Sequence, residues 1–304
     1  MSSMEGDPSA PRHGVALGAG AYLAWELLPV YWKALRHVPA GEILAHRMVW
    51  SLGVVLALLT LQRRWGGIGA ALRNRSVVLT FTASALLLSL NWFLYIWAVN
   101  SGYIVESSLG YFINPLVNVL LGIVFLRERL RRGQALALLV AALGVVYLTL
   151  LYGALPWIAL TLAVTFGFYG LLRKTAALDS LQGLTLETMV VFLPALGYLL
   201  FLQSHGRLAF GHASAGTTLL LVLSGVATAG PLLLFAAGAR RIPLTTMAIL
   251  QYISPSLQLL LGVFVYGEVL TPARLVGFCL IWLALAIYSA EGLMHGRRAR
   301  VVPV

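Results

Sequence analysis

The chain has 304 residues, of which 60% are hydrophobic and only 10% are charged, and its formal net charge is +11. Soluble domains carry about a quarter charged residues, so this composition excludes an ordinary soluble fold. The single cysteine, Cys279, excludes a disulfide framework and a cysteine-based metal site. The basic residues lie in short runs between apolar segments, a placement that indicates membrane topology rather than nucleic-acid binding.

Long apolar segments follow one another along the whole chain. A bilayer span needs about 20 apolar residues, and ten segments meet this requirement. They are expected at residues 14–34, 43–62, 77–99, 104–126, 134–152, 155–172, 184–203, 217–238, 243–266 and 273–291. The connections between them are too short to fold into a soluble domain. The sequence therefore predicts an all-α, multi-pass protein of the cell (inner) membrane.

The positions of Lys and Arg predict the orientation of these spans. Most of these residues lie in alternate connections, as in the run Arg127–Arg132, and at the C-terminus. Because basic connections stay on the cytoplasmic side, we expect both termini to be cytoplasmic.

Two stretches of the chain repeat one pattern at an offset of 140 positions: Tyr111–Gly122 and Gln251–Gly262. Within them Pro115 corresponds to Pro255 and Gly122 to Gly262, and beyond them Glu128 corresponds to Glu268, all without a gap. Five predicted spans separate equivalent positions. Since five is odd, the second copy enters the membrane from the opposite side. The sequence thus predicts two inverted five-helix repeats, an arrangement typical of secondary transporters.

The expected organisation has four parts. Residues 1–12 form a cytoplasmic tail, 13–152 the first five-helix repeat, 153–291 the second repeat, and 292–304 a basic cytoplasmic tail.

Polar and aromatic side chains within the repeated spans are candidates for substrate binding. They are Asn91, Trp92, Tyr95, Tyr111, Asn114, Asn118, Gln251, Tyr252 and Gln258. Pro115 and Pro255 each remove a backbone donor, so a helix break is expected near each proline. The amides have two interpretations that the sequence leaves open: they line a central cavity, or they hydrogen-bond between helices and hold the bundle together.

Ionisable residues within spans are candidates for gates or ion pairs, or for direct contact with the substrate, because charge is costly inside a bilayer. Arg47 and Glu187 occupy equivalent positions of the repeat. Each lies about one turn inside its helix entrance on opposite sides of the membrane, roughly 15 Å apart in depth, so we expect no direct bond between them. Glu106 is the expected partner of Arg47. The expected partners of Glu187 are Arg173, Lys174, Arg240 and Arg241.

Glu26 lies about half-way along the first predicted span. A proton-coupled carrier needs a protonatable group near the middle of the membrane, and Glu26 is the acid that could serve. The alternative is a buried carboxylate that hydrogen-bonds a neighbouring helix.

Several segments resemble the drug/metabolite transporter superfamily and, within it, the RarD-like permeases of the EamA group. The segments are Glu42–Arg47, Asn91–Asn100, Ser108–Asn118, Tyr169–Lys174 and Leu250–Pro255. The resemblance spans roughly residues 14–290. It implies a ten-helix inner-membrane permease with two EamA-type halves, in a group whose name is linked to chloramphenicol sensitivity. One departure is Glu26, where the family has a small residue.

The predicted function is therefore transport of a small amphipathic metabolite or drug by alternating access. Other classes are a membrane scaffold or auxiliary subunit and an intramembrane enzyme. The sequence has no His-Glu-x-x-His, Gly-x-Ser-x-Gly or Walker motif, so we expect no enzyme activity, ATP, metal or cofactor. The expected partners are the substrate and the lipid bilayer, with no nucleic acid, and the expected state is a monomer or weak dimer.

Overall fold

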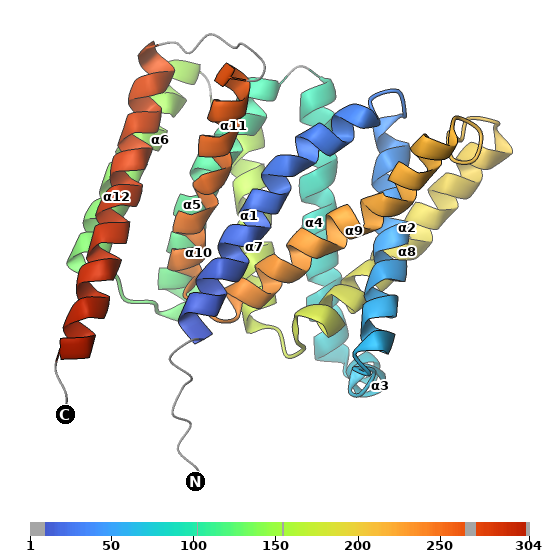
Figure 1. Ribbon diagram of the computed structural model, residues 1–304, viewed down its shortest axis with the longest axis horizontal. Coiled ribbons are helices and arrows are strands. Elements are labelled where there is room, and N and C mark those ends of the chain that lie inside the picture. Colours follow the sequence, from blue (N-terminus) through green and yellow to red (C-terminus); the bar gives the residue numbers. More distant parts are fainter. Residues whose placement is uncertain (1–9, 102, 154, 265–271, 302–304) are drawn as a thin grey trace. The chain divides into compact units, whose positions relative to one another are not determined.

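The computed structural model describes residues 10–101, 103–153, 155–264 and 272–301 of the chain. In these ranges the chain is helical, with no strand (Figure 1). The helices are α1 (Ala10–Ala34), α2 (Ala40–Leu61), α3 (Ile68–Arg73), α4 (Arg75–Asn100), α5 (Ile104–Leu126), α6 (Arg132–Tyr152), α7 (Trp157–Thr175), α8 (Ser180–Ser204), α9 (Ala215–Ala239), α10 (Leu244–Gln251), α11 (Ile253–Phe264) and α12 (Pro272–Val301).

Within the described residues, 7 helical segments are long and apolar enough to cross a membrane. They lie in α2, α4, α5, α6, α8, α9 and α12. In its described residues, each of the ten predicted ranges falls mainly on helix, but the range 243–266 is divided into α10 and α11, of 8 and 12 residues. That all ten ranges cross the membrane stays a prediction.

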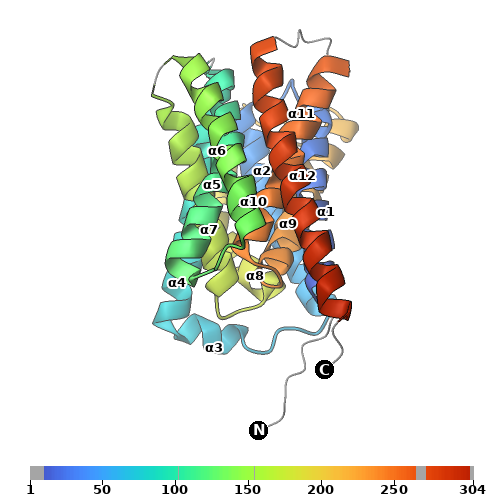
Figure 2. The ribbon, with the colours of Figure 1, turned by 90° about the vertical axis from the view of Figure 1, so that its left-hand side faces the viewer.

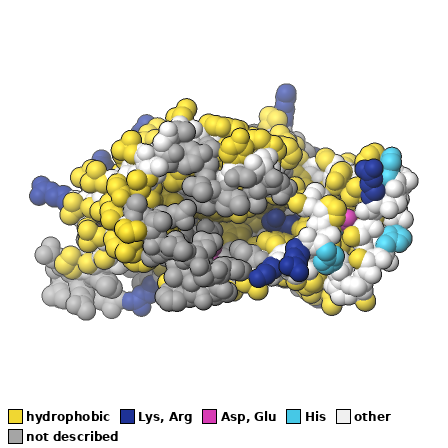
Figure 3. Space-filling model, turned by 90° about the horizontal axis from the view of Figure 1, so that it is seen from above, with side chains coloured by type: hydrophobic (Ala, Val, Ile, Leu, Met, Phe, Trp, Pro, Cys, Tyr) yellow, Lys and Arg dark blue, Asp and Glu magenta, His cyan; other side chains and the backbone are white. Residues whose placement is uncertain are grey.

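Large apolar side chains are exposed along these helices, as a lipid-facing surface requires. On α4, Leu79, Leu86 and Phe93 follow one another at intervals of two turns and are 57–62% exposed. In the view from above, Figure 3 shows hydrophobic side chains over part of the described surface. A soluble helix would carry charge at such positions, so these surfaces fit the bilayer.

Helix starts preserve the sequence offset of 140 positions. The starts of four helix pairs differ by this number: α2 and α8 at 40 and 180, α4 and α9 at 75 and 215, α5 and α10 at 104 and 244, and α6 and α12 at 132 and 272. Four helices of the first half therefore begin at positions equivalent to those of four helices of the second half.

The chain forms two compact units, and neither follows the sequence order. Unit 1 combines Met1–Ile96 with Phe168–Ile242, and unit 2 combines Trp97–Gly167 with Pro243–Val304. Each unit thus takes segments from both predicted repeats, whose boundaries stay a prediction.

In unit 1, α2 packs against α8 and α9, and α1 packs against α9 (Figure 1). Helices α2 and α9 approach most closely at Gly225, where an added Cβ would lie 2.4 Å from the backbone carbon of Trp50. The Ser51 hydroxyl lies at the same crossing and donates to the backbone oxygens of Arg47 (2.5 Å) and Gly225 (3.3 Å). A small residue at the crossing lets the two backbones approach, as is common between membrane helices.

In unit 2, α6 packs along α12 and α5 packs against α10 (Figure 2). Phe112, Val145 and Phe278 belong to the buried apolar core of this unit. The Glu128 carboxylate accepts hydrogen bonds from the backbone N–H groups of Leu244 (2.7 Å) and Thr245 (3.0 Å). These are free donors in the first turn of α10, so the acid caps this helix and its charge complements the helix dipole. The repeat counterpart of this acid, Glu268, lies outside the described residues.

The two prolines of the repeat differ in their effect on the helices. Near Pro255 the helix is interrupted at Tyr252, whose N–H bonds to the Ile249 oxygen three residues back. This agrees with the predicted break. Pro115, in contrast, lies inside the uninterrupted helix α5, so the break expected there is absent. Membrane helices tolerate proline because neighbouring groups satisfy the freed carbonyl.

Candidate functional site

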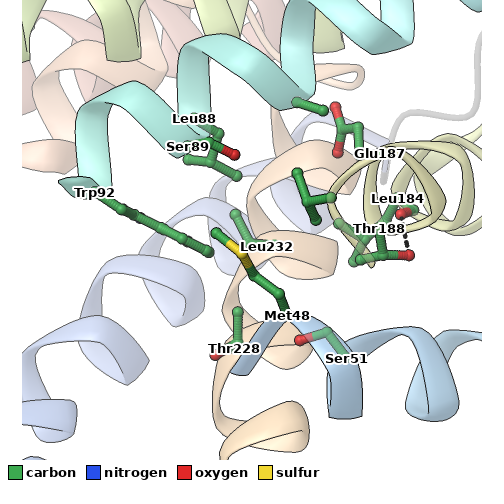
Figure 4. A pocket seen from close by; sticks show the side chains of 12 residues that line it. Met48, Ser51, Leu88, Ser89, Trp92, Leu184, Glu187, Thr188, Thr228 and Leu232 are labelled. Atoms are coloured by element: carbon green, nitrogen blue, oxygen red, sulfur yellow. Dashed lines mark hydrogen bonds between the residues drawn. The ribbon is translucent and has the colours of Figure 1, made fainter. Parts of the chain in front are cut away.

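Unit 1 contains a pocket between α2, α4, α8 and α9 (Figure 4). Its lining is mostly apolar, with a few hydroxyls and one carboxylate. The lining residues are Met48, Ser51, Ala85, Leu88, Ser89, Trp92, Leu184, Glu187, Thr188, Val191, Thr228 and Leu232. Figure 4 shows Trp92 and Glu187 on opposite sides, with Met48 between them. The cavity volume is about 30 Å³, which holds about two water molecules.

Eight of the twelve lining residues are related by the offset of 140 positions. Four pairs of lining residues are related by this offset: Met48 and Thr188, Ser51 and Val191, Leu88 and Thr228, and Trp92 and Leu232. Since α2 and α4 belong to the first predicted repeat and α8 and α9 to the second, both repeats contribute equivalent positions to one pocket.

Glu187 lies at one side of this pocket in a buried polar network. One carboxylate oxygen, Oε1, accepts a hydrogen bond from the Ser84 hydroxyl of α4 and lies 3.6 Å from Nη1 of Arg173. Arg173 also donates from Nη2 to the backbone oxygen of Ser180 at 2.8 Å, and its guanidinium lies 5.6 Å from the Phe81 ring centre. Among the described residues, the second oxygen of Glu187 has no hydrogen-bond partner. The opposite charges of Arg173 and Glu187 offset each other. The second oxygen of Glu187 is still available as a hydrogen-bond acceptor.

Arg47 lies at the other side and has a different environment. Its Nε donates to the Thr228 hydroxyl at 2.9 Å. Its guanidinium carbon lies 4.8 Å from the ring centre of Trp32 and 4.4 Å from that of Trp92. Trp92 and Thr228 both line the pocket, so Arg47 lies at its edge. Arg47 and Glu187 form no ion pair with each other in the described part of the chain.

The predicted amides form a separate cluster in unit 2. Nδ2 of Asn118 donates to Oδ1 of Asn114 at 2.8 Å and to Oε1 of Gln251 at 3.1 Å. All three side chains are buried. Because these groups hydrogen-bond one another across α5 and α10, the geometry favours interhelical packing over an open lining.

The remaining predicted residues are distributed over both units. In unit 1, Asn91 and Tyr95 lie on α4 without lining the pocket described above, and Glu26 is buried in α1. In unit 2, Tyr111 is partly buried, and the buried Tyr252 hydroxyl donates to the Phe112 oxygen at 3.5 Å. The side chains of Gln258 and Glu106 lie outside the described residues, so the proposed partner of Arg47 is not tested.

Several residues that contact Arg47 or Glu187 were not predicted as site residues, among them Trp32, Ser84 and Thr228. The offset of 140 was a usable signal for the serine, because Ser84 corresponds to Ser224 and both are buried hydroxyls. No such signal pointed to Trp32, since its contact with Arg47 depends on how α1 packs against the other helices of unit 1.

Comparison with known proteins places this architecture in a family. The family model described as "EamA-like transporter family" matches residues 12–150 and 155–290. The chain belongs to the EamA-like transporter family. It is 48% identical to "Protein RarD" of Streptomyces exfoliatus over 95% of this chain and 92% of that protein. It is also 48% identical to "Uncharacterized transporter YojE" of Bacillus subtilis, over 91% of this chain and 94% of that one.

One solved crystal structure has the same fold. It superposes with a TM-score of 0.67 at 22% identity and covers 90% of this chain and 96% of its own. The family and its relatives identify a multi-pass membrane transporter, for which a small-molecule substrate and a lipid bilayer are the implied partners.

Proposed function

We propose that this EamA-family protein is a secondary transporter that moves a small amphipathic metabolite or drug through the pocket of unit 1. The observation that carries this proposal is that four pairs of equivalent positions of the two predicted repeats line one cavity. In transporters built from inverted repeats, the substrate site lies where the repeats meet.

The size of the pocket supports a mechanism with moving helices. A drug-sized ligand needs a site of roughly 300–1,000 Å³, whereas this cavity measures about 30 Å³. Substrate passage therefore requires the lining helices to separate. In alternating access, the two inverted halves exchange conformations and open the site to each side in turn. Four pairs of helices whose first residues differ by 140 positions support this account.

The polar residues divide into two roles in this proposal. Trp92 and Thr228 face the pocket and contact the substrate, whereas Glu187 lies in its wall. Asn114, Asn118 and Gln251 hold α5 and α10 together, since they bond one another. Arg173 is the tie that keeps Glu187 in place.

Glu26 is the proposed coupling residue, because a buried acid in α1 is the group expected to take up a proton. Substituting Glu26→Gln should then flatten the pH profile of flux. A normal profile in this variant would remove Glu26 from the coupling step.

Flux measurement with the purified full chain in proteoliposomes tests the proposed function. Vesicles are loaded with chloramphenicol or with a cell metabolite extract, and efflux is followed by mass spectrometry. We expect saturable, protein-dependent efflux of at least one compound with its mass unchanged. Conversion of a compound would instead indicate an enzyme. The absence of saturable flux for every compound would indicate a scaffold or auxiliary subunit.

A further inference from the structure

Arg47 is a cation within unit 1 that no described carboxylate neutralises. Its guanidinium contacts the Thr228 hydroxyl and the rings of Trp32 and Trp92. A charged group in a membrane-spanning helix is stable only where it meets a partner or a water-filled cavity. Arg47 is partly exposed, unlike the fully enclosed Arg173. It therefore faces accessible space.

The contacts orient the guanidinium without using most of its donors. Three helices hold it: α1 through Trp32, α4 through Trp92 and α9 through Thr228. Its hydrogen bond involves Nε alone, so among the described residues the two terminal nitrogens have no hydrogen-bond partner. A guanidinium has five N–H donors in a planar fork, and four remain here. This geometry suits an oxyanion bound by two parallel hydrogen bonds.

The corresponding positions of the second half show why Arg47 has no carboxylate partner among the described residues. Lys33 and Arg47 lie 140 positions before Arg173 and Glu187. In the second half these two positions form the ion pair of 3.6 Å. In the first half both positions hold cations, so they cannot form the same ion pair. Lys33 is exposed at the end of α1, and two indoles flank Arg47 instead.

We infer that Arg47 recognises the substrate of unit 1 and that this substrate carries a carboxylate. One arginine matches one negative charge, and a planar carboxylate fits the free end of the fork. The rest of the substrate is apolar or aromatic, because Trp92, Met48 and Leu232 line the adjoining pocket. That this ligand is a transport substrate rests on the proposed function, whereas binding of the ligand at Arg47 can be tested without it.

Thermal unfolding of the purified full chain tests the recognition step. The probes are phenylacetate and phenylacetamide, which have the same shape but differ in charge. We expect phenylacetate to raise the melting temperature as a ligand of the native state does, and phenylacetamide to have little effect. Arg47→Gln should weaken phenylacetate binding about 10- to 100-fold, the loss expected for a hydrogen-bonded charge.

Two further variants separate recognition from folding. Arg47→Lys keeps the charge but loses the fork, so it should fold and bind phenylacetate about tenfold more weakly. Arg207→Gln removes an arginine that is exposed after α8 and should bind as the wild type does. Equal effects of the two probes, or wild-type affinity for phenylacetate in Arg47→Gln and Arg47→Lys, would overturn the inference.

A lipid phosphate is the other source of an oxyanion, and nanodiscs distinguish it. If phosphatidylglycerol stabilises the protein through Arg47 while phenylacetate does not, the residue is a lipid site and the inference is wrong. The flux assay separates carboxylate recognition at Arg47 from the proposed transport function. Flux of neutral or cationic compounds without carboxylate binding overturns recognition and leaves transport in place. Carboxylate binding at Arg47 without any flux supports recognition and overturns transport.

Discussion

At the scale of single residues, the buried pair of Arg173 and Glu187 has the largest expected effect on stability. Both side chains are almost fully enclosed, and removing one partner of a buried pair costs about 3–5 kcal/mol because the other charge stays buried. We therefore expect Arg173→Met to lower the melting temperature strongly.

The double variant Arg173→Met with Glu187→Met is the matched control, since replacing both charges by apolar groups is often neutral. It should recover most of the lost stability in the same thermal unfolding experiment. If the double variant melts as low as Arg173→Met, packing rather than charge determines the stability at this site.

At the scale of elements, the close crossing of α2 and α9 determines the position of Arg47 relative to Thr228. An added Cβ at Gly225 would meet the backbone of Trp50 at 2.4 Å. Substituting Gly225→Ala should therefore force the helices apart and destabilise the protein by about 1–3 kcal/mol. It should also lengthen the contact between Arg47 and Thr228 and reduce flux.

Gly230 provides a control on the same helix, because an added Cβ there has nothing within 4 Å. Substituting Gly230→Ala should leave stability unchanged or raise it by up to about 1 kcal/mol. Melting temperatures of the two variants, measured side by side, give the comparison. Equal stability of both variants would show that the crossing tolerates a methyl group.

The sequence predicted the helices better than it predicted the site. Apolar length locates a membrane helix almost independently of its neighbours, which is why the expected ranges fall on helix. The effect of proline depends on the surroundings, and Pro115 and Pro255 differ for that reason. The pocket forms where α2, α4, α8 and α9 lie next to one another. The hydrophobic periodicity of the sequence does not predict which helices are neighbours. The sequence did single out Arg47 and Glu187, the charged residues at the pocket, because charge within a membrane span is rare.

At the scale of the whole molecule, the inverted arrangement makes a prediction about topology. With cytoplasmic termini, the connection after α2 lies inside the cell and the connection after α8 lies outside. Single cysteines can report this in a Cys279→Ala background, at the exposed positions Gly66 and Ala213. In intact cells, a membrane-impermeant maleimide should label Ala213→Cys and not Gly66→Cys. The reverse pattern would contradict the predicted orientation.

Transport through the pocket of unit 1 is the central claim, and blocking the pocket tests it most directly. Ser89 lines the pocket, whereas Ala83 is exposed on the same helix, α4. The measurement is saturable flux in proteoliposomes for the variants Ser89→Phe and Ala83→Phe, each confirmed as folded by thermal unfolding. We predict that Ser89→Phe abolishes flux of every substrate and that Ala83→Phe transports as the wild type does. Normal flux through folded Ser89→Phe would contradict the account.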